Sequence, residues 1–556
     1  MANPFGYIGR ARPRYSRFNW SNEHTFTCDM GELIPFFCEY LPPGGRLKGG
    51  VEAIIRFQPL VAPVLHSINC YFHFFFIPLR LIDKNFTNFI TGGEDGSFNS
   101  PPPLWPINEN NGLYSLFDYM ETIPSSDFNS VGFDPSMMPV DWKRRAYNFV
   151  WNEFYRDENL QDPYQVIPED EPTLSPNFSV LHRAWEKDYF TTALPWLQRG
   201  IAPAFPISGS IPVSIKGSPF TVDGSNFSVN LPVNFSGTSK IQYNGNDGWV
   251  NSDSAGVSGS GTNLNAVLRS SGSSYRSSGS VQGSVNGSVS GSQQVTPEVS
   301  GSINIENATT FDVNDVRRAF QIQKFMERNA RAGVRYTEFL QAHFDVKPQD
   351  SRLQRPEYLG GSKTSVIVSE VLQTSSSTSD SPQGSMAGHG ITAVKDYCFN
   401  YRAQEYGIVL GLLSVMPRSS YQQGIRRQDL VRSRYDMVFP EFVNLSEQPV
   451  YGNEIYFNNE SSDWQKNIFG FQGRYNEYRS VPSRVSSDMR FKFDYWNLAR
   501  KFDSEPQLNA SFIECNPSKR IFAVQDEKGL IVTVGSVMNC ILPIPKVAEP
   551  GLVDHH

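Results

Sequence analysis

The residues of this 556-residue chain that could carry catalysis or bind a metal ion do not form a complete motif. The segment 360–364, GGSKT, resembles the end of a phosphate-binding loop, but a glutamate stands where that loop begins with glycine, and a strand is expected to follow instead of a helix. His66 and His73 are seven residues apart, which in a strand places them on opposite faces and disfavours a shared metal ion. The acid pair Asp157 and Glu158 lies in a polar segment, where solvated carboxylates are expected. The sequence contains no H-E-x-x-H or G-x-S-x-G motif, so no enzyme class, metal or other cofactor is indicated.

The first residues of the chain have a different chemistry, suited to phosphate groups. Residues 1–22 carry four arginines and no acidic residue, and the arginines are Arg10, Arg12, Arg14 and Arg17. Gly, Pro and Asn surround them, so we expect an extended arm and no helix. An arginine that neutralises a nucleic-acid phosphate releases counterions and gains affinity. The alternative is an ordinary solvated terminus, and four charges alone do not decide between the two.

The overall composition favours β structure and large packed surfaces. The formal net charge is −7, which argues against a protein whose entire surface binds nucleic acid. Charged residues make up 19%, below the roughly 25% of ordinary soluble domains. The chain holds 40 Phe, 24 Tyr, 43 Gly and 38 Pro, an aromatic-rich and turn-rich composition.

Membrane and secreted classes are disfavoured. The longest apolar runs, 70–77 and 406–416, are well short of the roughly 20 residues of a membrane helix. The N-terminus has no apolar segment of the secretory type. The six cysteines lie far apart without a C-x-x-C pair, which favours reduced, buried thiols and synthesis in the cytoplasm.

Most of the chain is predicted to form short strands. Residues 24–90 alternate between apolar and polar positions, and the aromatic run 70–78 is typical of a strand buried on both faces. Strands separated by turns return in 360–556, including 365–371, 408–416 and 530–537. A helix is predicted over 141–162, capped by Asp141. Many strands, long loops and few helices indicate a β-sandwich or jelly roll that carries insertions.

The segment 206–308 differs in composition, since Ser and Gly occupy 24 of the 50 positions in 251–300. A disordered linker is one interpretation. We favour a β-rich projection, because 227–233 alternates strictly and Val281, Val285 and Val289 recur with a period of four, which places them on one face of a strand.

A second helix is predicted over 312–344, capped by Asp312 or Asn314 and interrupted at Gly333. Its cationic side chains fall along one line at 100° per residue: Arg317, Lys324, Arg328, Arg331 and Arg335. A solvated face that pairs with neighbouring acids is the favoured explanation of this stripe.

Four segments resemble the major capsid protein of microviruses, the small single-stranded DNA bacteriophages, and in particular its gokushovirus branch. They are the opening strands around 24–42, the stretch 74–93 (FFFIPLRLIDKNFTNFITGG), the stretch 188–200 (DYFTTALPWLQRG), and the long match 314–361 that continues to 390.

The resemblance implies an eight-stranded jelly roll that self-assembles into an icosahedral virion shell around circular single-stranded DNA. It implies four regions: a basic arm (1–22), a first part of the core (23–205), a Ser/Gly-rich β projection (206–308), and a helix with the remaining core (309–556). The arm arginines would face the DNA, with a small basic phage protein as a second DNA-binding partner and a scaffold protein as a further possible one. The projection would contact a host receptor, with Tyr243, Asn246 and Trp249 as candidate contacts.

Two other classes remain open at this point. A jelly-roll adhesin or receptor-binding protein would explain the β insertion without forming shells. A β-sandwich glycosidase would need two carboxylates roughly 5–10 Å apart, and no motif supports such a pair.

Overall fold

The computed structural model divides into two compact units, Met1–Arg199 with Glu327–His556, and Gly200–Met326. The structure describes residues 13–106, 112–120, 138–200, 313–333, 335–372, 386–457 and 467–547, together with the backbone of the strands between 210 and 304.

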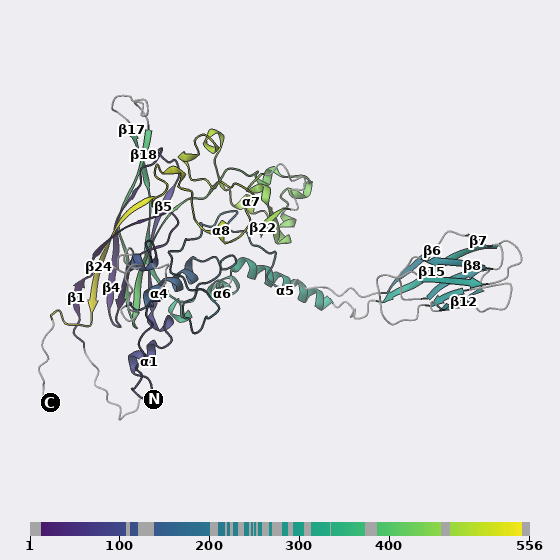
Figure 1. Ribbon diagram of the computed structural model, residues 1–556, viewed down its shortest axis with the longest axis horizontal. Coiled ribbons are helices and arrows are strands. Elements are labelled where there is room, and N and C mark those ends of the chain that lie inside the picture. Colours follow the sequence, from purple (N-terminus) through teal and green to yellow (C-terminus); the bar gives the residue numbers. More distant parts are fainter. Residues whose placement is uncertain are drawn as a thin grey trace. The chain divides into compact units, whose positions relative to one another are not determined.

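The larger unit is built on two antiparallel sheets (Figure 1). The first has the order β1-β24-β4-β18-β17, with β2 also paired to β24, and the second has the order β16-β5-β19-β3. The strands of the first sheet are β1 (Ser16–Asn19), β2 (Asn22–Cys28), β4 (Arg46–Phe57), β17 (Ile367–Leu372), β18 (Met386–Arg402) and β24 (Leu530–Leu542). Those of the second are β3 (Ile34–Leu41), β5 (Ile68–Pro78), β16 (Glu357–Ser365) and β19 (Gly407–Pro417).

The eight main strands have the connectivity of a jelly roll. In chain order they alternate between the rows β2-β24-β4-β18 and β3-β19-β5-β16, except that β5 and β16 follow one another within the second sheet, and this connectivity confirms the predicted fold class. Within the described residues the two sheets do not join into a closed barrel. The predicted strand 365–371 is wrong in its limits. Ser365 ends β16 in one sheet and Ile367 begins β17 in the other, so the chain changes sheets at Val366.

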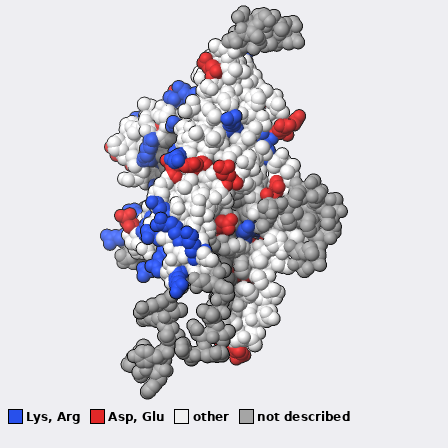
Figure 2. All heavy atoms as spheres, turned by 90° about the vertical axis from the view of Figure 1, so that its left-hand side faces the viewer, with Lys and Arg blue, Asp and Glu red and all other residues white. Residues whose placement is uncertain are grey.

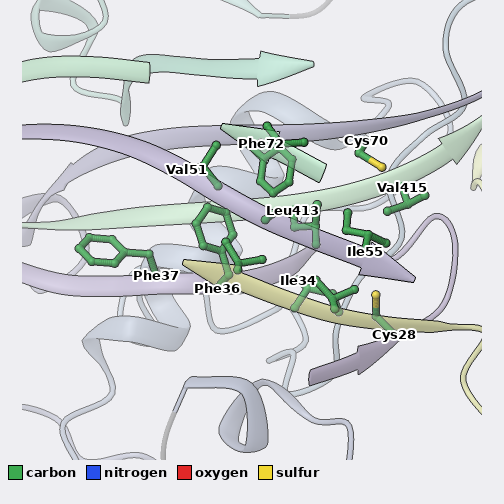
Figure 3. Packing of buried hydrophobic residues seen from close by; sticks show 14 of the residues in the cluster. Cys28, Ile34, Phe36, Phe37, Val51, Ile55, Cys70, Phe72, Leu413 and Val415 are labelled. Atoms are coloured by element: carbon green, nitrogen blue, oxygen red, sulfur yellow. The ribbon is translucent and has the colours of Figure 1, made fainter. Parts of the chain in front are cut away.

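The main core lies between these two sheets. Figure 3 shows side chains from four strands pointing toward one another, among them Phe36, Val51, Phe72 and Leu413. All four are 3% exposed or less. Side chains alternate across a strand, so along β4 every second residue from Leu47 to Phe57 is buried, together with one further glycine.

The second sheet is also covered on its other face. Phe75 and Ile77 of β5 and Leu410 of β19 pack into a second cluster with Tyr147 and Trp151 of the helical segment that follows. All residues of β19 are buried. This explains the continuous aromatic run 70–78 and confirms the prediction that this strand is buried on both faces.

The helix predicted over 141–162 is shorter than expected. It comprises α4 (Trp142–Val150) and a π-helical turn (Trp151–Tyr155). Asp141 occupies the N-cap position, but its carboxylate makes no cap hydrogen bond. It accepts hydrogen bonds from the guanidinium groups of Arg144 (2.7 and 2.6 Å) and Arg145 (3.0 Å), which are themselves buried. The prediction of a capping side chain is therefore wrong, because two buried cations compete for the carboxylate.

The predicted break at Gly333 is confirmed. The helices α5 (Val313–Ala332) and α6 (Tyr336–Phe344) are separated by Gly333 with φ of 104°, a conformation that favours glycine. Arg335 is therefore the N-cap of α6 and does not continue the cationic line of α5. Arg331 pairs with Glu447 and Arg335 with Glu158, in agreement with the expected pairing to neighbouring acids.

Short elements complete the larger unit. The helices are α1 (Phe86–Thr91), α2 (Leu116–Met120), α7 (Asn476–Arg479) and α8 (Ala510–Ile513), and the short strand pairs are β20 (Ser420–Tyr421) with β23 (Ser483–Arg484) and β21 (Glu447–Tyr451) with β22 (Ile468–Gly473). A third apolar cluster joins the segment 189–193 to this region through residues such as Phe190, Tyr421 and Phe512.

The smaller unit contains strands and the first part of α5. The strands are β6 (Ser210–Lys216), β7 (Phe220–Val222), β8 (Asn226–Leu231), β9 (Thr238–Tyr243), β10 (Asn246–Asp247), β11 (Trp249–Asn251), β12 (Ser254–Val257), β13 (Ala266–Arg269), β14 (Val281–Asn286) and β15 (Gln293–Asn304). β14 pairs with β8, so that Val281 and Val285 lie opposite Leu231 and Phe227. Val289 lies outside the described residues.

Candidate nucleic-acid interface

The outer face of the first sheet is exposed and carries cations at one end. On β4, Leu47, Val51 and Ile55 point into the core, whereas Arg46 and Lys48 point outward and are exposed. We call the end of this face that carries Arg17, Arg46, Lys48, Tyr397 and Arg402 the basic sheet face. Figure 2 looks onto the side on which β1, β4 and β24 lie, and Lys and Arg side chains gather toward the end where β1 lies.

The strand register arranges three arginines in one row. Arg17 of β1 lies opposite Ile541 of β24, Ile541 lies opposite Arg46 of β4, and Arg46 lies opposite Arg402 of β18. Neighbouring strands are about 4.8 Å apart, so the three intervals span about 14 Å. These arginines, separated by up to 385 positions in the sequence, thus form a cationic row that Ile541 interrupts at one position.

The next row on the same face is polar and holds a further cation. It consists of Asn19, Asn539, Lys48 and Asn400, which are register partners in that order. Arg46 Nε donates a hydrogen bond of 2.9 Å to Asn400 Oδ1, which joins the two rows. Lysine, arginine and asparagine side chains all donate to phosphate oxygens.

An exposed aromatic ring stands beside these rows. Tyr397 is 59% exposed, and the Lys48 ammonium group lies 5.0 Å from its ring centroid. The ring is placed by a bulge in β18 next to Gly50 of β4, where a Cβ atom would lie 2.5 Å from the Asp396 carbonyl oxygen. An exposed ring next to a cation can stack a nucleobase while the cation contacts the backbone.

Acidic residues on this face lie away from the arginine row. Glu52 of β4 pairs with Lys395 at 2.5 Å. Glu23 of β2 and Glu52 of β4 are the two register partners of Gly535, which lies between them in β24. Asp396 accepts a hydrogen bond from Ser362 of the second sheet. Burial and the nearby Asp396 carboxylate raise the pKa of the Cys398 thiol to about 11. The Cys398 thiol is therefore protonated and unreactive at neutral pH.

The structure describes only part of the predicted arm. Arg14 is exposed and lies two residues before β1, and Arg17 lies within that strand, whereas Arg10 and Arg12 lie outside the described residues. The start of the chain is therefore not wholly an extended arm, since Ser16–Asn19 is the edge strand of the sheet. Phe18 and Trp20, which pack against the main core, hold it there.

The predicted host contacts lie on strands of the smaller unit. Tyr243 ends β9 and is the register partner of Asn246 in β10, and Trp249 begins β11. The backbone thus places Tyr243 and Asn246 side by side. Their role as host contacts stays a prediction.

The motifs that resembled catalytic or metal sites have structural roles. The segment 360–364 lies in β16, where Lys363 is 4.9 Å from the Tyr71 ring centroid. His66 precedes β5 and bonds the Arg418 carbonyl oxygen at 2.6 Å, whereas His73 lies within β5 and bonds the Tyr155 hydroxyl at 2.7 Å. Burial and nearby Arg183 lower the pKa of His73 to about 4, so it is neutral at pH 7.

The expectation of solvated acids at 157–158 is wrong. The side chains of Asp157 and Glu158 are each 7% exposed and pair with Lys187 and Arg335, respectively, at 2.5 Å. The loop folds back against these cations, which a local sequence pattern does not reveal. Among the described residues, no three His, Cys, Asp or Glu side chains are grouped to hold a metal ion, and no helix is long and apolar enough to cross a membrane.

The basic sheet face was largely missed by the sequence reasoning. The alternation Arg46-Leu47-Lys48 was a local signal for outward cations on a strand, but nothing local linked Arg46 to Arg17 or Arg402. The cysteines agree with the expected reduced state, since all six are free thiols and four are buried.

Comparisons with known proteins identify the family. Residues 8–552 match the family described as capsid protein (F protein). The capsid protein VP1 of Chlamydia phage 1 is 33% identical, over 99% of this chain and 98% of its own length. VP1 of Bdellovibrio phage phiMH2K is 31% identical, over 94% and 92%, and VP1 of Spiroplasma virus 4 is 26% identical, over 94% and 93%. These relatives confirm the resemblance found in the sequence and do not favour an adhesin. The chain belongs to the F-protein family of capsid proteins and is a structural component of a virion.

Proposed function

We propose that this capsid protein encloses a circular single-stranded DNA genome and that the basic sheet face lies against that DNA. The observation that carries the proposal is the row of Arg17, Arg46 and Arg402 across four strands, next to Lys48 and the exposed ring of Tyr397. The opposite, second sheet is covered by the chain's own helices and loops, so the first sheet offers the accessible flat surface.

The recognition is electrostatic and independent of base sequence. The arginines neutralise phosphates and release counterions, while Tyr397 stacks on whichever base reaches it. These side chains contact phosphates and ring faces, so they do not require a particular base sequence. Such binding is expected for a shell that must package an entire genome.

The arginines that precede β1 in the sequence belong to the same proposal. Arg10, Arg12 and Arg14 lie two to six residues before this edge strand, which makes them further candidates for phosphate contacts. The chain as a whole has a net charge of −7, and a separate small basic protein would supply the remaining neutralisation. A scaffold protein is a further partner that assembly could require.

The test is the DNA content of particles. In the variant R17Q/R46Q/R402Q we expect shells that still form but carry less DNA, measured by the ratio of absorbance at 260 and 280 nm and by buoyant density. The matched control K84Q/K347Q/R352Q removes three exposed cations elsewhere and should package normally. Equal DNA content in both variants would contradict the proposal.

The Ser/Gly-rich strands support a second proposal, a projection that contacts the host through Tyr243, Asn246 and Trp249. Deleting 215–300 should abolish attachment to host cells and leave particle assembly intact. An adhesin would lose its whole function on the same deletion, and loss of assembly would contradict the assignment of this unit to the surface.

A further inference from the structure

A segment of the larger unit, residues 433–445, exposes an unusual amount of apolar surface. It contains two short 3₁₀-helices, Arg434–Asp436 and Pro440–Leu445. Six large apolar side chains within it are exposed: Tyr435 (53%), Met437 (49%), Val438 (43%), Phe439 (40%), Val443 (43%) and Leu445 (60%). Single exposed apolar residues are normal, but six in thirteen positions form a patch of the kind that marks an interaction site.

The backbone of this segment is held firmly by the rest of the unit. The Tyr475 hydroxyl accepts a hydrogen bond from the Phe439 amide at 3.2 Å and donates one to the Met437 carbonyl oxygen at 3.1 Å. Arg474 donates from its side chain to the Tyr435 carbonyl oxygen at 3.2 Å. The chain itself therefore satisfies three backbone groups in the middle of the segment, while six of its apolar side chains are exposed.

The aromatic rings of the segment support one another. Phe442 packs edge-on against Tyr435 and Phe439, with ring centroids 6.1 and 5.7 Å apart, and the Arg474 guanidinium lies 5.7 Å from the Phe442 ring. Rings held in this way lose little conformational freedom when a partner covers them. Tyrosine, phenylalanine, methionine and arginine are the residue types enriched in protein–protein interfaces.

We propose that the segment 433–445 seats against a second copy of this chain in the assembled shell. A capsid is built from many identical copies, so each copy must present surfaces that another copy buries. The patch carries charges of both signs, with Arg432 directly before it and Arg434, Asp436 and Glu441 within it, so it can complement an identical chain. Tyr478, 50% exposed, lines the same small cavity as Asp436 and widens the patch. The inference rests on membership of the capsid family and not on the proposed contact with DNA.

Chemical accessibility tests the proposal directly. Val443→Cys is labelled with a maleimide in intact particles and in particles dissociated into folded subunits, with the parent chain giving the background of its native thiols. We expect labelling at least about 10-fold slower in intact particles, because the partner copy covers the side chain. Equal labelling rates in the two states would overturn the proposal. It would also be overturned if labelling slowed only when a host or scaffold protein was added.

Assembly provides the second test. The variant F439D/V443D loses the ring contact between Phe439 and Phe442, so it should remain folded with a slightly lower melting temperature, but it should fail to form particles in sedimentation and negative-stain images. The control L65D introduces a charge at a side chain that is 71% exposed and outside the segment, and it should still assemble. Particles of F439D/V443D at the parental yield would overturn the proposal. Should the double variant fail to fold, the labelling result decides.

Discussion

Removing the arginine row should change the salt dependence of DNA binding by a predictable amount. Each phosphate contact to single-stranded DNA contributes about 0.7 to the slope of log K against log salt concentration. Replacing Arg17, Arg46 and Arg402 with glutamine removes three cations that lie within about 14 Å on one face. The slope should therefore become shallower by about 2, and the affinity advantage of the parent chain should shrink about 16-fold between about 50 and about 200 mM salt.

Fluorescence anisotropy of a labelled oligothymidylate with dissociated subunits measures these slopes. A second oligonucleotide of mixed sequence should give the same result, since the arginines contact phosphates and no base edges. The control K84Q/K347Q/R352Q removes the same number of charges from exposed sites elsewhere and separates local contact from the general effect of net charge. An unchanged slope in R17Q/R46Q/R402Q, or an equal change in the control, would refute the reasoning.

Three further predictions concern single residues. Tyr397→Ala should weaken single-stranded DNA binding by about 1–3 kcal/mol without altering the salt slope, because stacking involves no counterion release; a change in slope in the same titrations would contradict this. Asp141→Asn should destabilise the larger unit by about 3–5 kcal/mol in thermal melts, because it leaves the buried guanidinium groups of Arg144 and Arg145 without a counter-charge. A loss of stability below about 1 kcal/mol would show that the Asp141 carboxylate is dispensable to the fold. The pKa of His73 is about 4 in the folded chain and near 6.5 in the unfolded chain, so between these pH values the unfolded chain binds more protons. The free energy of unfolding therefore falls as the pH is lowered through this range, by up to about 3 kcal/mol. His73→Gln should remove this part of the pH dependence when melting temperatures at pH 7 and pH 4.5 are compared, and an unaltered pH dependence would exclude His73 as its source.

The sequence predicted best where the signal was local. The break at Gly333 follows from the conformational freedom of one residue, and it is confirmed by the positive φ at that position. The burial of 70–78 on both faces follows from a run that is aromatic or apolar at every position but His73, although the helix that covers the outer face could not be identified from the run itself.

The sequence predicted worst where a charge finds a partner from another part of the fold. Asp141 is a good capping residue by its type and position, yet it binds two arginines because burial makes an unpaired guanidinium costly. Glu158 seemed solvated because its neighbours in the sequence are polar, whereas Arg335 reaches it from a distant segment.

The sequence by itself determined the fold class, the capsid family and the presence of a basic segment at the start of the chain. These follow from patterns that a few neighbouring residues carry, such as the period-two alternation of a strand, and from long segments of family resemblance. Only the tertiary structure decided that Arg17, Arg46 and Arg402 form one row and that the apolar side chains of 433–445 face outward. The register between strands depends on the packing of both sheets around their shared core, and that packing brings together residues hundreds of positions apart.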